Sequence, residues 1–70
     1  MPEKIEFETQ SAAERYAEKH GTVTKLRGGA WRAWVKMPDG NQIKEYGHEK
    51  AHAVANAATA LLQKYPYRYE

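Results

Sequence analysis

Cysteine does not occur in this 70-residue sequence, and its absence excludes several kinds of structure and chemistry. Disulfide frameworks, zinc sites built on thiolates and thiol nucleophiles all require cysteine. Because chains without disulfides are typical of reducing compartments, we expect a cytoplasmic protein. The sequence also lacks an apolar run near the length of a membrane-spanning helix, and its charged start does not resemble a secretory signal, so we expect no membrane partner.

The chain is short, and its charge is unevenly distributed. Seventy residues make one small domain, near the size at which a single hydrophobic core is just sufficient. We expect this domain to span residues 1–70, with 66–70 as a short extended tail. The net charge is only +2, but residues 1–20 hold five Glu against three Lys and Arg, whereas residues 21–46 hold five Lys and Arg against two carboxylates. Positive charge is therefore concentrated in the middle of the chain.

The segment Gly28–Tyr46 has the pattern of a β-hairpin with two different faces. At its centre, Pro38-Asp39-Gly40 favours a three-residue turn in which Gly40 adopts a positive φ. This turn places Val35 opposite Ile43 and Trp34 opposite Lys44, because a register shifted by one residue would mix apolar and charged side chains. The expected apolar face consists of Trp31, Ala33, Val35, Met37 and Ile43. The expected polar face consists of Arg32, Trp34, Lys36, Lys44 and Tyr46.

Local signals predict a helix and a strand before the hairpin, and they give the bounds of the last strand of the sheet. Ser11 followed by Glu14 is a capping-box pattern, which predicts a helix over Ser11–His20. Alternating β-branched residues predict a strand over Thr22–Arg27, and the last strand of the sheet is expected over Gln42–Tyr46. The buried stripe of the first helix is expected at Ala12 or Ala13, Tyr16, Ala17 and His20.

Helical spacing predicts a longer helix over Glu49–Lys64, which Tyr65-Pro66 should end. The alternating residues 4–8 fit either a short edge strand or an extended segment laid on the core. We therefore predict an α+β fold of helix, three-stranded antiparallel sheet and helix, with both helices on the apolar face of the sheet. The expected buried stripe of the longer helix is Ala51, Val54, Ala55, Ala58, Leu61, Leu62 and Tyr65.

The polar face of the predicted sheet is the main functional clue, because it combines cations with large aromatic side chains. Exposed aromatic residues in a small domain often mark an interface. An ordinary solvated sheet surface would also carry Arg and Lys, and Trp34 would lie in the core if the register shifted. Tyr65, Tyr67 and Tyr69 fit a role in covering the edge of the core. The candidate binding residues are Lys25, Arg27, Arg32, Trp34, Lys36, Lys44 and Tyr46.

Part of the sequence resembles the three-stranded-sheet DNA-binding domains of phage integrase amino termini and plant ethylene-response factors. The similarity covers about residues 22–62 and consists of GAWRAWVK at residues 29–36, an Asp-Gly turn, a third strand and an Ala-rich helix. It implies that the exposed sheet face enters the major groove, with Arg32, Trp34 and Lys36 near the bases and phosphates. The helix order also resembles double-stranded-RNA-binding domains, although only Lys50 matches the lysine cluster that begins their second helix.

One motif points to metal chemistry. His48-Glu49-Lys50-Ala51-His52 matches H-E-x-x-H, in which two histidines one helical turn apart bind zinc and Glu acts as general base. Here the motif begins next to Gly47, at the start of the predicted helix. The only acidic residue after the motif that could serve as a third ligand is Glu70, which lies beyond Pro66. We therefore predict no metal site, no cofactor and no catalytic activity.

Together, these patterns predict a small non-enzymatic protein that binds nucleic acid, with duplex DNA favoured over RNA, through the basic and aromatic face of its sheet. Arg and Lys would contact phosphates, and Arg32 and Trp34 would lie nearest the bases or sugars. The alternative is a protein-binding adaptor or inhibitor, of the kind that phages and mobile elements encode, which would use the same face. Neither hypothesis involves a small-molecule substrate.

Overall fold

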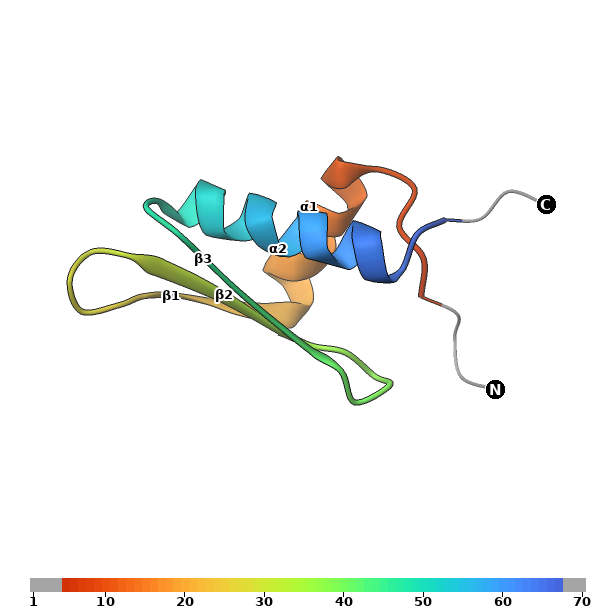
Figure 1. Cartoon of the computed structure of the whole chain (residues 1–70), viewed down its shortest axis with the longest axis horizontal. Helices are drawn as coiled ribbons and strands as arrows, with labels where there is room; N and C mark the ends of the chain where they lie inside the picture. Colours follow the sequence, from red (N-terminus) through yellow and green to blue (C-terminus); the bar gives the residue numbers. More distant parts are fainter. Residues whose placement is uncertain (1–4, 68–70) are drawn as a thin grey trace.

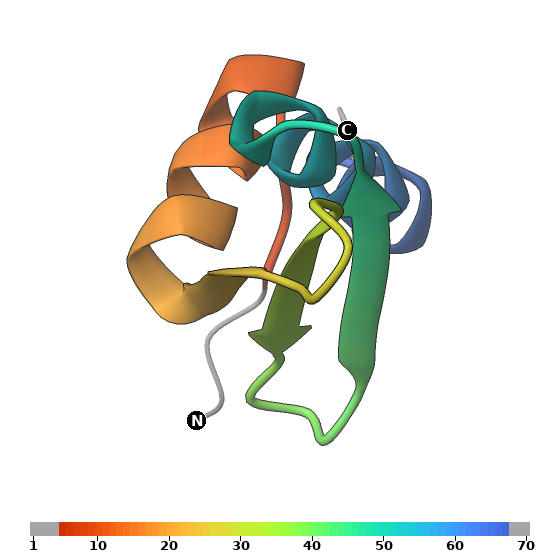
Figure 2. The same ribbon diagram turned by 90° about the vertical axis from the view of Figure 1, so that its left-hand side faces the viewer.

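The computed structural model describes residues 5–67, which form a three-stranded antiparallel sheet with two helices on one side. Figures 1 and 2 show both helices above the same face of the sheet, which confirms the predicted α+β fold. Within the described residues, no helix is long and apolar enough to cross a membrane. In chain order the elements are α1 (Gln10–His20), β1 (Gly21–Lys25), β2 (Trp31–Lys36), β3 (Gln42–Gly47) and α2 (Lys50–Lys64).

The β2–β3 turn has the predicted three-residue geometry. The Met37 amide donates to the Asn41 carbonyl at 2.8 Å, the Gly40 amide donates to the Met37 carbonyl at 3.0 Å, and Gly40 adopts a φ of 95°. A residue with a side chain would be strained at this φ, so glycine at this position fixes the turn. The register that follows pairs Val35 with Ile43 and Trp34 with Lys44, as predicted.

The β1–β2 turn repeats the same hydrogen-bonding pattern. The Leu26 amide donates to the Ala30 carbonyl at 2.6 Å, and the Gly29 amide donates to the Leu26 carbonyl at 3.1 Å. Because Leu26 and Ala30 close the turn, β1 ends at Lys25 and not at Arg27, which corrects the predicted strand. Successive pairs then place Lys25 opposite Trp31 and Thr22 opposite Trp34.

The first helix begins differently from the prediction. Its N-cap is Thr9, whose extended backbone lets the side-chain Oγ1 accept a hydrogen bond from the Ala12 amide at 3.1 Å. The predicted cap at Ser11 is therefore wrong, and Ser11 lies inside the helix. The earlier start allows Gln10 to donate from Nε2 to the Ala55 carbonyl of α2 at 3.0 Å. The Thr9 cap is thus accompanied by a contact between the two helices.

The core combines small and medium-sized side chains, and the buried residues of α2 differ from the predicted stripe. Of the predicted residues, Ala51 is exposed and Ala55 and Leu62 are only half-buried. Because α2 packs against α1 as well as the sheet, its buried face is wider and turned toward both. On α1, Tyr16 is half-buried and His20 is exposed. The core consists of Phe7, Ala13, Ala17, Ala33, Val35, Met37, Ile43, Ala53, Val54, Ala57, Ala58 and Leu61.

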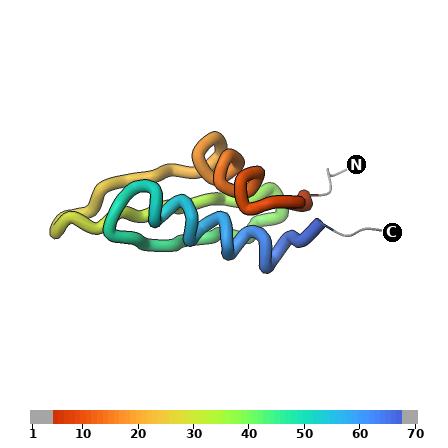
Figure 3. The backbone as a smooth tube through the Cα atoms, turned by 90° about the horizontal axis from the view of Figure 1, so that it is seen from above, coloured from red at the N-terminus to blue at the C-terminus, as the bar shows by residue number. Residues whose placement is uncertain are grey.

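The segment before α1 pairs with the segment after α2. The Phe7 amide donates to the Tyr65 carbonyl at 2.9 Å, and the Tyr67 amide donates to the Phe7 carbonyl at 3.1 Å. Phe7 is thereby an extended residue laid on the core and does not join the sheet as an edge strand. Figure 3 shows both ends of the described chain at the same end of the molecule. Tyr69 and the rest of the predicted tail from residue 68 lie outside the described residues.

A polar network fastens the β2–β3 turn to the end of α2. The Asp39 carboxylate accepts from the Asn41 amide at 3.0 Å and from the Tyr65 hydroxyl at 2.7 Å, and Asn41 Nδ2 donates to the Tyr65 hydroxyl oxygen at 3.1 Å. The hydrogen bond from the Asn41 amide, followed by that from Tyr65, holds the pKa of Asp39 below its ordinary value. Burial, assisted by the neighbouring carboxylate, raises the pKa of Tyr65. The turn is therefore anchored at its charged residue.

Candidate nucleic-acid interface

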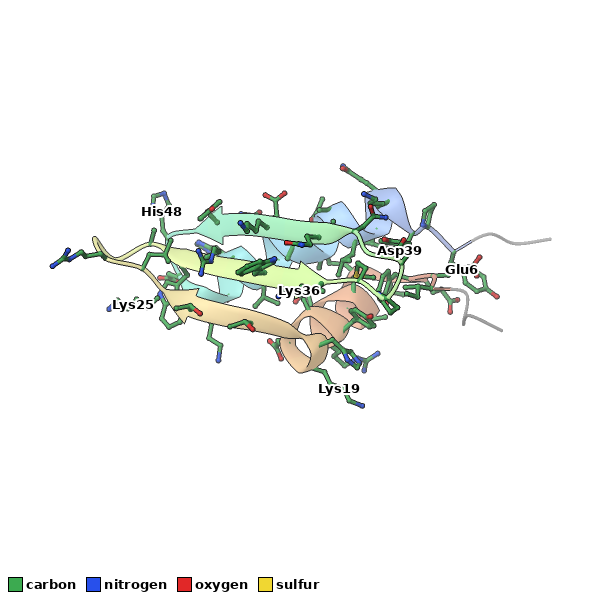
Figure 4. All side chains as sticks on the ribbon, turned by 90° about the horizontal axis from the view of Figure 1, so that it is seen from below. Glu6, Lys19, Lys25, Lys36, Asp39 and His48 are labelled. Carbon is green, nitrogen blue, oxygen red and sulfur yellow. The ribbon has the colours of Figure 1, made fainter. Side chains whose placement is uncertain are left out.

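The sheet face away from the helices carries the even-numbered side chains of the three strands. Figure 4 views this face, with Lys36 on its central strand. Alternation along each strand and the observed register place these side chains on one surface, which we call the open face. Among the described strand residues, this face includes three cations and no carboxylate. The open face consists of Thr22, Thr24, Arg32, Trp34, Lys36, Gln42, Lys44 and Tyr46.

Trp34 lies at the centre of the open face, and its ring position is fixed by a hydrogen bond. The indole Nε1–H donates to Oε1 of Gln42 on β3 at 3.0 Å. Gln42 is the cross-strand partner of Lys36, so this bond directs the half-buried indole from β2 toward β3. Trp34 is therefore neither part of the core nor covered by the described tail, and the alternative of a shifted register is wrong.

Three cations lie over the Trp34 ring. Lys44 Nζ is 4.5 Å from the ring centre, Lys36 Nζ is 4.9 Å away, and the Arg32 guanidinium carbon is 5.4 Å away. Lys36 and Arg32 stand two residues to either side of Trp34 on β2, and Lys44 stands directly opposite on β3. We call these four residues, together with Gln42, the Trp34 cluster.

Attraction to the Trp34 ring opposes the mutual repulsion of the three cations. At about 10 Å, the largest separation that the ring distances allow, two like charges in water repel each other by about 0.4 kcal/mol, and the repulsion rises as they approach. One exposed cation–π contact contributes about 0.5–1 kcal/mol. The ring can therefore hold three cations close together, although their mutual repulsion remains. An anion placed beside them would relieve that repulsion, so the cluster is an electrostatically suitable anion site.

A hollow of about 290 Å³ lies on the open face beside Trp34. Its lining includes His20, from the last turn of α1, and Thr22, from β1, together with Arg32, Trp34 and Lys36. Sequence reasoning assigned His20 to the buried stripe of α1 and so missed it as a site residue. The signal for its position was the adjacent Gly21, since the helix ends there and the chain enters the sheet without a linker.

Comparisons of the chain with protein-family models, with curated proteins and with solved structures gave no match. The geometry of the open face is therefore the basis for proposing a function.

The structure brings together only some of the predicted binding residues. Tyr46 lies on the open face opposite Arg32, with 52% of its surface exposed. Lys25 pairs with Trp31 and therefore projects toward the helix side, at the end of the sheet where Figure 4 labels it. Arg27 lies in the β1–β2 turn. These two residues flank the end of the sheet and do not belong to the Trp34 cluster.

The H-E-x-x-H motif does not place both histidines on one helix. Glu49 is the N-cap of α2, so His48 precedes the helix and only His52 lies within it. All three side chains are exposed. Among the residues that the structure describes, no group of three or more potential metal ligands comes together. His48 and His52 therefore do not form the zinc-protease geometry, in which both histidines lie on one helix, one turn apart.

Proposed function

We propose that this protein binds nucleic acid without catalysing a reaction, and that duplex DNA is its favoured partner. The observation that supports this most is the gathering of Arg32, Lys36 and Lys44 around Trp34 on a sheet face that neither helix covers. Contacts between cations and phosphates supply most of the non-specific affinity of proteins for DNA. The net charge of +2 is modest, but its location on the open face is what such contacts require.

A sheet surface is also a suitable shape for duplex DNA. The major groove, about 12 Å wide, admits a two-stranded β-ribbon. β2 and β3 form such a ribbon, and between them they supply the three cations and both aromatic residues of the open face. In this arrangement the ribbon follows the groove, and Arg32, Lys36 and Lys44 lie toward one phosphate backbone. The similarity to three-stranded-sheet DNA-binding domains implies that the exposed sheet face enters the major groove.

The test is a titration of the folded protein with duplex DNA, duplex RNA and single strands at about 50 and 200 mM salt, followed by NMR chemical shifts and fluorescence anisotropy. We expect shifts at the open face and an affinity that falls with salt. Lys36→Ala and Lys44→Ala should weaken binding to all sequences, and each should reduce the slope of log affinity against log salt by about one unit. Lys50→Ala is the matched control, since Lys50 is an exposed lysine at the start of α2.

The outcome at Lys50 separates two orientations of the protein. A loss of affinity and of salt slope at Lys50, with none at Lys36 and Lys44, would place the nucleic acid on the helix side and contradict the proposal. Failure of the folded protein to bind any duplex or single strand below about 100 μM at low salt, weaker than ordinary non-specific affinity, would also refute it.

A protein-binding adaptor is the second candidate, and the exposure of Tyr46 favours it. Among the described residues, Tyr46 is one of the two exposed large hydrophobic side chains, and tyrosine and tryptophan are common at the centres of protein interfaces. Under this hypothesis, Trp34→Ala and Tyr46→Ala would abolish binding to a purified partner, while salt would have little effect. Binding that depends strongly on salt, and that Lys36→Ala weakens as much as Trp34→Ala does, would favour the nucleic-acid function instead.

A further inference from the structure

We propose that Trp34 is a positioning residue, whose ring gathers three cations into one phosphate-binding site, and that the open face recognises the nucleic-acid backbone and not the bases. This inference depends on the proposed function for the identity of the ligand. It differs from the expectation drawn from the sequence, which placed Trp34 against bases or sugars.

The Trp34 ring is not a free stacking platform. The hydrogen bond from Nε1 to Gln42 holds the indole toward β3, and cationic groups lie 4.5, 4.9 and 5.4 Å from its centre. A base that stacked on the ring would compete with those charges for the same surface. A phosphate would instead approach the charges while they remain beside the ring. The occupied ring therefore favours phosphate over base.

The cluster is also small. Because no charged group is more than 5.4 Å from the ring centre, any two of the three charges are at most about 10 Å apart, which is about one screening length in 0.1 M salt. One strand of duplex DNA carries a phosphate per about 3.4 Å of helix axis, so a site of this width meets about three phosphates. The number of cations and the number of phosphates within reach are therefore similar.

The surroundings of the cluster add two polar residues. Thr22 and His20 line the hollow beside Trp34 together with Arg32 and Lys36, and the His20 imidazole packs against the Tyr16 ring with the ring centres 4.4 Å apart. A threonine hydroxyl and an imidazole N–H can both donate hydrogen bonds to phosphate oxygens. The Trp34 ring also restricts long side chains that would otherwise move freely in solvent, which reduces the conformational entropy lost when a phosphate binds.

The experiment compares probes with and without bases. The wild-type protein is titrated with inorganic tripolyphosphate, with an oligothymidine strand and with an abasic strand of the same length. We expect tripolyphosphate to compete with DNA, and the abasic and thymidine strands to bind within about twofold of each other, since phosphate contacts dominate single-strand affinity in this arrangement. An abasic strand that binds tenfold or more weakly than oligothymidine would show stacking on bases and overturn the inference.

Two variants test the role of the ring. Trp34→Phe keeps an aromatic face, whereas Trp34→Leu keeps apolar bulk without a ring that attracts cations. We expect Trp34→Leu to lower DNA affinity about fivefold to tenfold and to reduce the salt slope by about one unit, while Trp34→Phe retains most of both. An unchanged salt slope in folded Trp34→Leu would contradict a positioning role. Gln42→Leu removes only the acceptor of the indole N–H, and it should also lower the DNA affinity and the salt slope. This variant tests the role of the ring if Trp34→Leu does not fold.

The outcomes also separate this inference from the proposed function. Binding of tripolyphosphate at the Trp34 cluster without binding of any nucleic acid would retain the phosphate site and reject the proposed function. Base-dependent binding of nucleic acid would retain the proposed function and reject the phosphate site. Chemical-shift changes confined to the helix side would reject both.

Discussion

Val35 is the residue whose truncation tests most directly which face of the sheet forms the core. It is fully buried near the end of β2, opposite Ile43, on the side of the sheet that the helices cover. Val35→Ala removes two methyl groups worth about 0.8 kcal/mol each, and the cavity left behind raises the expected loss to about 2–3 kcal/mol. Because a single core in so small a domain supplies only about 3–5 kcal/mol, this is about half of the total stability. Urea denaturation followed by circular dichroism measures the loss.

The neighbouring residue provides the control. Lys36 is exposed on the opposite face, so Lys36→Ala should change the unfolding free energy by less than about 0.5 kcal/mol. Both variants should keep the urea m-value, since neither should alter the surface exposed on unfolding by much. If Lys36→Ala destabilised the protein more than Val35→Ala, the register and the assignment of the open face would both be wrong.

Three further predictions concern the cap, the turn and the histidines. Thr9→Ala should lower the unfolding free energy by about 1 kcal/mol, because it removes the acceptor of an N-terminal amide, whereas Ser11→Ala should have little effect in the same denaturation assay. The pKa of Asp39 is lower in the folded protein than in the unfolded chain. Its carboxylate therefore stabilises the fold at pH values above the unfolded pKa, and this stabilisation is lost as the pH falls through the folded pKa. In acid titrations, Asp39→Asn should lose stability less steeply than wild type over this pH range. EDTA should leave the melting temperature unchanged, and a drop that zinc reverses would establish a metal site at His48 and His52.

The parts of the fold that were predictable are those with strong local chemistry. Pro38-Asp39-Gly40 determines its own turn, and the turn determines the register of β2 and β3 and hence the open face. The same logic applied to Gly29 would have placed Lys25 opposite Trp31, on the helix side and apart from the open face. The length of the β1–β2 turn was left open, although the sequence carried enough information to predict it.

The parts that were mispredicted depend on tertiary contacts. Thr9 and Ser11 are both good capping residues, and a contact between Gln10 and the other helix accompanies the choice of Thr9. In α2, alanine occupies positions on several faces of the helix. The spacing of apolar residues therefore could not show which face is buried. The convergence of cations on Trp34 depends on side-chain rotamers and on the bond to Gln42, and sequence alternation predicts only that these residues share a face.

Trp34 lies outside the core although the core is small, and this position bears on its role. The largest fully buried side chains are only Leu61 and Val35, so burial of an indole would add substantially to stability. Trp34 nevertheless remains half-buried on the uncovered face, bonded to Gln42 and approached by three cations. A protein partner that used this ring as an apolar anchor would first have to displace those charges. A phosphate partner would use them where they are, and that difference is why we favour the nucleic-acid backbone as the ligand.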